Sequence, residues 1–432
     1  MQPVRIINST DTRTVAALLD RRPGRDTGLE RRVARIVERV RARGDAALLE
    51  YARRLDGLDG PLEITRAEME RAAGTVPADV KRAIRTAARH IRHVARRQVP
   101  RAWSAAPAPG VTIQQRVTPL DRVGCYIPGG RYPLPSSLLM TAVPARVAGV
   151  AEILAACPRP DAAVMFAALE SGVTRLFRMG GAHAIAAFAF GTRRVPRVDK
   201  IVGPGNAWVS AAKARVSAAC AIDFVAGPSE IAVVSAAGTP AWIAADLIAQ
   251  AEHDPEARAI LLTPSRRLAS AVAREVARQL PDEGTARLAM ARNGGIVVTR
   301  TLDEAIALCG RLAPEHAVCD SGTAAARLTR AGTVFVGRHS AQALGDYVTG
   351  SNHVLPTMGG AAARGGLSAA DFVRLSTVQH ISPAGLRRIA PAGIALAEAE
   401  GLSGHAASMR IRLGRSARTG NSRRAARRSA SR

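Results

Sequence analysis

Several residue types are scarce in this sequence, and each scarcity argues against a class of protein. Five cysteines among 432 residues are too few for a disulfide scaffold, and none forms a CxxC pair of the zinc-cluster or thioredoxin type. Aromatic residues make up only 3% of the chain, which disfavours a surface that stacks nucleic-acid bases. No uncharged apolar run reaches 18 residues, and the N-terminus lacks an apolar signal region. We therefore expect a cytoplasmic protein without a membrane span.

Lysine is also scarce, although the chain is strongly basic. The formal charge is +26, yet only three of the 61 cationic residues are lysines: Lys81, Lys200 and Lys213. The last 32 residues contribute nine arginines and no acidic residue. From residue 414 onward the sequence is basic, of low complexity and without an apolar face, which predicts a disordered tail. This tail is the main support for one alternative function, nucleic-acid binding.

What the chain has is length, apolar residues and a regular alternation of short elements. Apolar residues make up 47%, and 432 residues predict two or three domains. Beyond about residue 118, Val- and Ile-rich runs alternate with Ala-rich helical stretches, which predicts βαβ units, a mainly parallel sheet and an α/β fold. We expect strands at 152–156, 173–177, 201–202, 231–235, 259–262, 296–299 and 334–336, and helices at 161–169, 182–190, 207–219, 240–251, 266–280 and 302–312.

The two ends of the chain are predicted to be helical. Apolar residues recur at helical spacing over 29–55 and again over 80–97. Residues 382–409 are expected to form a terminal helical element.

Glycine-rich turns raise the possibility of a nucleotide site. The fingerprints GxGxxG and GxxxxGK[ST] are both missing. Three strand-to-helix turns, at 127–131, 179–182 and 202–206, could instead offer backbone N–H groups to a phosphate. Each is equally compatible with an ordinary βα turn.

Four short motifs carry groups suited to metal binding or proton transfer. Gln250 and His253 share one helical face and suit a divalent metal, but an isolated QxxH is more often a polar helix end. The adjacent Glu315 and His316 could form an acid/base pair if both reach one pocket. The loop 345–356 and the segment 400–405 add the candidates Asp346, His353, Glu400 and His405.

Eight segments in collinear order resemble the histidinol dehydrogenase family. They are VGCYIPGGRYPLPSSLLM, GGAHAIAAFAFGT, VDKIVGPGNAWV, AGPSE, QAEHDP, APEH, GDYVTGSNHVLPT and EGLSGH. Together they cover roughly residues 25–412. The resemblance implies oxidation of L-histidinol to L-histidine through histidinal, the last steps of histidine biosynthesis, with two NAD reduced and one Zn²⁺ per subunit.

The resemblance also implies an architecture. Two Rossmann-like lobes without the GxGxxG fingerprint, plus small helical terminal segments, would form an intertwined homodimer. Residues 1–24 would be an N-terminal segment, 25–125 with 231–366 the first lobe with a helical N-terminal part, and 126–230 the second lobe. Residues 367–413 would form a C-terminal helical segment that reaches the partner subunit, followed by the basic tail 414–432.

Site residues follow from the resemblance position by position. The zinc ligands would be Gln250, His253, Asp346 and His405, the last supplied by the partner subunit. His316 would act as the base and Glu315 would activate water. Substrate would contact Ser229, Gln250, His253, Glu315, His316, Asp346, Glu400 and His405.

The NAD contacts implied by the resemblance are Tyr126, His183 and Asn206. Position 183 often carries Gln in the family, and position 313, here Ala, usually carries Gly. A closely related alternative is a dehydrogenase of another small alcohol, such as a sulfonated diol, on the same scaffold.

Overall fold

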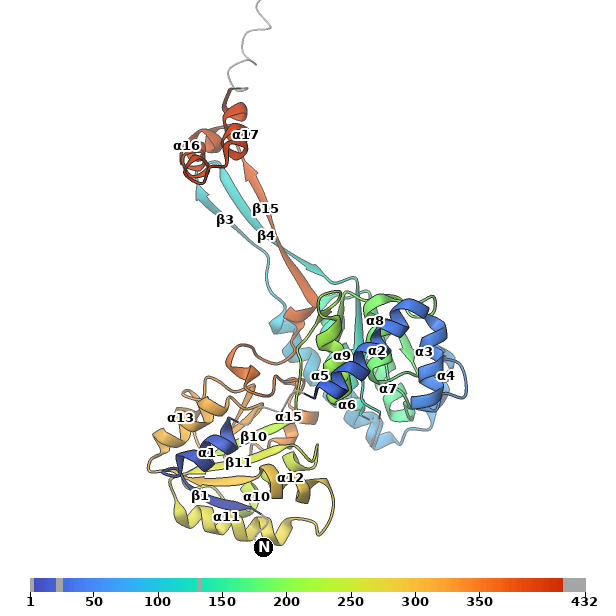
Figure 1. The fold of residues 1–432 in the computed structure, drawn as a ribbon, viewed down its shortest axis with the longest axis vertical. Helices are drawn as coiled ribbons and strands as arrows, with labels where there is room; N and C mark the ends of the chain where they lie inside the picture. Colours follow the sequence, from blue (N-terminus) through green and yellow to red (C-terminus); the bar gives the residue numbers. More distant parts are fainter. Residues whose placement is uncertain (1–3, 21–25, 130–133, 415–432) are drawn as a thin grey trace, which may run out of the picture. The chain divides into compact units, whose positions relative to one another are not determined.

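A computed structural model describes residues 4–20, 26–129 and 134–414. Contacts divide the chain into two compact units, Met1–Val99 with Leu120–Phe372, and Pro100–Pro119 with Val373–Arg432. Each unit is described on its own. The described chain is an α/β protein whose larger unit contains two sheets, each covered by helices (Figure 1).

The first sheet has six parallel strands in the order β1-β12-β11-β10-β13-β14. Numbered from β10, strands β10 to β14 therefore run 3-2-1-4-5, which places a topological switch point between β10 and β13. Helices α10, α11 and α12 cover one face, and α1 and α13 cover the other. The strands are β1 Arg5–Asn8, β10 Glu230–Val234, β11 Arg258–Thr263, β12 Gly295–Val298, β13 His316–Cys319 and β14 Thr333–Val336. The helices are α1 Thr12–Leu19, α10 Pro240–Ala251, α11 Arg266–Gln279, α12 Thr285–Asn293, α13 Leu302–Leu312, α14 Gly322–Ala325 and α15 Ala343–Tyr347.

The second sheet also has six strands, in the order β2-β7-β6-β5-β8-β9, and only β2 runs antiparallel. Its switch point lies between β5 and β8. The strands are β2 Glu63–Ile64, β5 Arg122–Tyr126, β6 Glu152–Ala156, β7 Arg175–Phe177, β8 Lys200–Val202 and β9 Ala221–Ile222. The helices are α2 Thr27–Arg43, α3 Asp45–Tyr51, η1 Ala52–Asp56, α4 Arg66–Gly74, α5 Ala78–Gln98, α6 Pro135–Ala148, α7 Ala162–Ser171, α8 Gly181–Phe190 and α9 Ala207–Val216.

The N-terminal helix α2 packs against a different sheet from the one that the expected lobe boundaries imply. The expected first lobe joins residues 25–125 to 231–366, but Val33, Val37 and Val40 of α2 join the core of the second sheet. The partner helix α8 is rich in alanine, so the two backbones can approach closely and bury the valine stripe. Conversely, β1 from the N-terminal segment pairs with β12 in the first sheet.

The smaller unit combines an antiparallel sheet with a helical pair. Strands run in the order β15-β4-β3, with β3 Trp103–Ala108, β4 Val111–Pro119 and β15 Val373–Ile381. Helices α16 Pro383–Ala399 and α17 Ser403–Gly414 follow. The helical prediction for 382–409 is confirmed, but the expected helical segment 367–413 begins with the 3-10 helix Ala369–Phe372 and the nine-residue strand β15. Residues 415–432 of the predicted tail lie outside the described part.

Most predicted elements of the larger unit are present. The predicted bounds of β6, α10 and α13 coincide with those observed, and the other predicted strands and helices of the alternating region differ by a few residues at their ends. Helices α6 and α12 of that region were not predicted. In the described residues, no helix combines the length and the apolar character needed to cross a lipid bilayer.

Candidate functional site

The strand pairing of β10 with β13 brings Glu315 beside Ser229 and Glu230. Ile231 pairs with His316, so the amino ends of both strands lie together. The carboxylate Oε2 of Glu315 accepts the backbone N–H of Glu230 at 3.0 Å, and Ser229 also hydrogen-bonds this carboxylate. The cluster therefore lies at the amino ends of the two strands that flank the switch point.

His316 is the first residue of β13 and Glu315 directly precedes it, after a left-handed turn at Ala313. Ala313 has φ +47°, a conformation that favours glycine, and it ends α13. Burial raises the pKa of Glu315 to about 8, and the charges of Asp346 and Glu230 act in the same direction. Burial lowers the pKa of His316 to about 4. Both groups thus favour their neutral forms.

His316 lies between two carboxylates. Its Nδ1 is 3.9 Å from Glu315 Oε2, and its Nε2 is 3.8 Å from Asp346 Oδ1. Nδ1 is buried and has no hydrogen-bond partner among the described residues. A neutral imidazole with an unused nitrogen can accept a proton from a bound molecule.

Of the predicted metal ligands, His253 lies near Asp346. His253 Nε2 lies 3.9 Å from Asp346 Oδ2. His353, a second candidate from the same loop, contacts the Asp346 carbonyl oxygen through Nδ1 at 2.8 Å and Ser137 Oγ through Nε2 at 3.3 Å. Burial lowers the pKa of His353, which favours its neutral form.

Gln250 is fully buried on α10, one turn before His253. Neither Oε1 nor Nε2 of its side chain has a hydrogen-bond partner among the described residues. A buried amide with both atoms unused is unusual and fits a side chain that holds a further group. In the described residues, no three His, Cys, Asp or Glu side chains are grouped to hold a metal ion.

The remaining predicted ligands belong to the smaller unit. Glu400 ends α16, and His405 lies in the first turn of α17. Both residues are exposed within the chain.

Tyr126 and Asn206 lie at the carboxyl ends of β5 and β8, which flank the switch point of the second sheet. These strand ends are in contact, since a Cβ added to Gly203 would meet the Tyr126 carbonyl oxygen at 2.2 Å. Asn206 is exposed and caps α9 by accepting the N–H groups of Trp208 and Val209. Ligands of open α/β sheets bind at such a point.

His183 is turned away from solvent. Its Nε2 lies 2.8 Å from Asp56 Oδ2, and its ring stacks on Tyr51 with centroids 5.8 Å apart. The same Asp56 oxygen accepts the N–H of Gly180, and the Tyr126 hydroxyl accepts the N–H of Gly181.

The predicted phosphate-binding turns have other partners for their backbone. Side chains within the chain take the N–H groups of Gly180 and Gly181 in turn 179–182, and Asp223 takes that of Gly203 in turn 202–206. The N–H groups named here are thus not available to a phosphate in this conformation. Part of the turn 127–131 lies outside the described residues.

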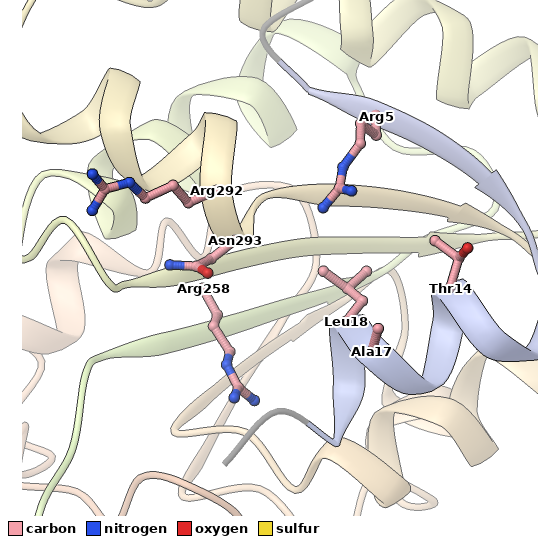
Figure 2. Close-up of a pocket in the computed structure, with 7 residues that line it drawn as sticks. All are labelled: Arg5, Thr14, Ala17, Leu18, Arg258, Arg292 and Asn293. Atoms are coloured by element: carbon pink, nitrogen blue, oxygen red, sulfur yellow. The ribbon is translucent and has the colours of Figure 1, made fainter. Parts of the chain in front are cut away.

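A cavity of about 400 Å³ lies apart from the cluster, near the amino ends of β1 and β11. Figure 2 shows that the guanidinium groups of Arg5, Arg258 and Arg292 do not converge on one point. Arg292 pairs with Glu256 at 3.2 Å, and Arg258 with Glu230 at 3.5 Å. The cavity therefore lacks the focused charge of an anion site.

Sequence reasoning overlooked four residues that contact the predicted site. Glu230, Arg258, Gln342 and Asp56 hydrogen-bond or pair with predicted site residues or with their neighbours. Glu230 follows Ser229 directly, which was the one available signal. Gln342 and Arg258 lie three residues outside the motifs 345–356 and 250–255, and only Asp56 is far from any motif along the chain.

Comparison with known proteins identifies one family. The histidinol dehydrogenase family model matches residues 19–413. A histidinol dehydrogenase of Geobacter sulfurreducens is 46% identical over 415 residues, covering 92% of this chain and 96% of the relative. One of Aromatoleum aromaticum is 43% identical, covering 93% and 95%. The crystal structure of histidinol dehydrogenase from Elizabethkingia anophelis has a TM-score of 0.90 at 31% identity, covering 96% of this chain and 99% of that one.

Proposed function

The chain belongs to the histidinol dehydrogenase family of NAD-dependent oxidoreductases, and on that premise we propose that it oxidises L-histidinol to L-histidine through histidinal with two NAD reduced. The observation that carries this proposal is the buried Glu315–His316 pair, with Asp346 3.8 Å from His316. The proposal extends to the last steps of histidine biosynthesis and to a cytoplasmic location.

Zinc fits the donor set at Asp346. Gln250, His253 and Asp346 would hold the ion together with His405 of the partner subunit. Two imidazoles and two oxygen donors suit Zn²⁺ and leave room for ligand atoms of a substrate. The two unused amide atoms of Gln250 and the 3.9 Å approach of His253 to Asp346 support this assignment.

NAD fits the switch point between β5 and β8. The strand order 3-2-1-4-5 in both sheets supports Rossmann-like lobes, and Tyr126 and the turn before Asn206 flank the switch point of the second sheet. His183 would act on this site through Asp56 and the start of α8 rather than by direct contact, because its ring is buried against Asp56.

Bound NAD would accept hydride, and bound zinc would orient the amine and imidazole of histidinol. The chain's own residues would move the protons. His316, kept neutral by burial, would take the hydroxyl proton on its unused nitrogen as the alcohol becomes an aldehyde.

Glu315 would serve the second oxidation. Because burial raises its pKa to about 8, only the ionised fraction of Glu315 can act as a base. That carboxylate would accept a proton from the water that attacks the aldehyde, while the N–H of Glu230 and the Ser229 side chain hold it in place. Burial excludes bulk water from this position. Ser229 and Glu400 complete the proposed substrate contacts, Glu400 through its charge toward the substrate's amine.

The smaller unit supports the proposed intertwined homodimer. Its described residues bury only four apolar side chains: Val111, Ala390, Ala397 and Ala406. Six large apolar side chains of the unit are exposed instead, namely Trp103, Leu375, Ile381, Leu396, Leu402 and Ile411. So small a core does not stabilise a unit of this size, and a second copy of the chain would cover the exposed side chains.

NAD reduction with histidinol, before and after chelation, tests the proposal. Histidinol to histidine is a four-electron oxidation, so purified enzyme should reduce about two NAD per histidinol. A chelator should abolish turnover, and added zinc should restore it. One NAD per substrate, or turnover only with another small alcohol such as a sulfonated diol, would favour the related dehydrogenase instead.

A further inference from the structure

Gln342 is a buried amide in contact with Asp346. It precedes α15, its side chain is fully buried, and its Nε2 donates to Asp346 Oδ2 at 2.9 Å. Its Oε1 has no hydrogen-bond partner among the described residues. Among the described residues, the side-chain amide of Gln342 therefore hydrogen-bonds Asp346 through its nitrogen, and its oxygen bonds no other group.

Asp246 joins this contact to helix α10. Its carboxylate accepts the backbone N–H of Gln342. On α10, Asp246 lies one turn before Gln250, so the two share a face, and His253 follows two residues after the helix ends at Ala251. One carboxylate thus fastens the start of α15, which carries Asp346, to the segment that carries Gln250 and His253.

The short helix α15 depends on such anchors. It has five residues, and no side chain caps its N-terminus. A single helical turn has little stability of its own, so the placement of Asp346 must come from tertiary contacts. A hydrogen bond to one carboxylate oxygen also fixes the rotation of the carboxyl group. Removing a group that orients a metal ligand in this way typically lowers metal affinity 10- to 100-fold.

We infer that Gln342 and Asp246 are positioning residues that hold the Asp346 carboxylate for a divalent metal. Gln342 sets the rotation of the carboxyl group, and Asp246 sets the distance of α15 from α10. The inference rests on the proposed zinc site and adds two residues that bind neither the metal nor the substrate.

The test measures zinc affinity on the full-length enzyme by competition with a chromophoric chelator. Gln342→Leu removes the donor while keeping a similar volume, and Gln279→Leu is the control. Gln279, the last residue of α11, is also an amide donor, although only partly buried; its Nε2 donates to the carbonyl oxygen of Ala241, at the start of α10, at 3.0 Å. We expect Gln342→Leu to weaken zinc binding about 10- to 100-fold and Gln279→Leu to leave it unchanged. The melting temperatures of the two metal-free variants should agree.

Asp246→Leu provides an independent second variant if Gln342→Leu does not fold. It should weaken zinc binding in the same direction, because α15 loses its tie to α10. A zinc dissociation constant within threefold of the native value in the folded variants would overturn the inference. Failure of the proposed function is distinguishable, since the native enzyme and Gln279→Leu would then also bind zinc weakly or not at all.

Discussion

Lys213 donates its ammonium proton to the carbonyl oxygen of Gly203 at 2.9 Å, inside the turn that leads to Asn206. The same ammonium pairs with the fully buried carboxylate of Asp223, which in turn accepts the N–H of Gly203 at 2.8 Å. Burial lowers the pKa of Lys213, and the charge of Asp223 opposes that shift. In a chain that uses arginine almost everywhere, lysine occupies a site where a compact point charge fits between backbone and carboxylate.

Lys213→Met should lower the free energy of unfolding by about 3 kcal/mol or more, because a buried carboxylate then loses its partner. It should also raise KM for NAD more than KM for histidinol, since the turn before Asn206 loses an anchor. Urea denaturation and steady-state kinetics measure these effects. Lys81→Met, on α5, is the control. Equal changes in both variants would contradict a role for Lys213 in the turn.

Glu230 makes stability depend on pH. Burial raises its pKa to about 7, Arg258 opposes the shift, and the neighbouring Glu315 is the other titratable group that faces it. Between the unfolded value of 4.5 and about 7 the unfolded chain is ionised while the folded one is largely neutral, so stability falls as pH rises through this window.

Glu230→Gln should remove this dependence. Relative to the native enzyme, its stability should improve by about 3 kcal/mol between pH 5 and pH 8. Urea midpoints at several pH values measure the change, with Glu252→Gln at the exposed end of α10 as the control. If the stability difference between Glu230→Gln and the native enzyme is the same at pH 5 and at pH 8, Glu230 is ionised in the folded protein at both pH values.

Substitutions of Glu315 and His316 should affect the two oxidation steps differently. Glu315→Gln should still oxidise the alcohol but reduce about one NAD per histidinol, because water attack on the aldehyde then slows about 10²- to 10⁴-fold. His316→Gln should slow both oxidations. Product analysis for histidinal and counting of NAD reduced test this division. Loss of the first oxidation in Glu315→Gln would contradict it.

Mixed dimers test whether two subunits share one site. Measured as histidine formed, His405→Ala and Glu315→Gln should each have almost no activity, and His405→Ala should also lose zinc. Random exchange makes half of the dimers mixed, each with one intact site of two, so about a quarter of native activity should return. Differently tagged subunits verify that exchange takes place. If exchange occurs and no activity is recovered, each subunit completes its own site.

The basic tail should be separable from catalysis. Truncation after Gly414 should leave dehydrogenase activity unchanged and weaken retention on a polyanion column, because the removed residues carry arginines and no acidic residue. Salt elution and NAD reduction compare the two chains. Collapse of activity would mean that the enzyme extends into the tail.

Local periodicity was enough to predict most secondary structure of the larger unit. The bounds of α10 and α13 follow from apolar spacing and flanking turns, which are properties of neighbouring residues. The antiparallel strands β3, β4 and β15 were not predicted. Their pairing joins residues 111–119 to 373–381, and such long-range partners leave little local signal.

By itself, the sequence determined the family, through eight collinear motifs, and with it a list of candidate site residues. Only the tertiary structure decided how those side chains are used. Glu230 meets Glu315 across 85 residues and His183 meets Asp56 across 127, so the first pair is joined by strand pairing and the second by helix packing. Burial then raised the pKa of Glu315 and lowered that of His316, because desolvation depends on everything packed around a group and not on its neighbours in sequence.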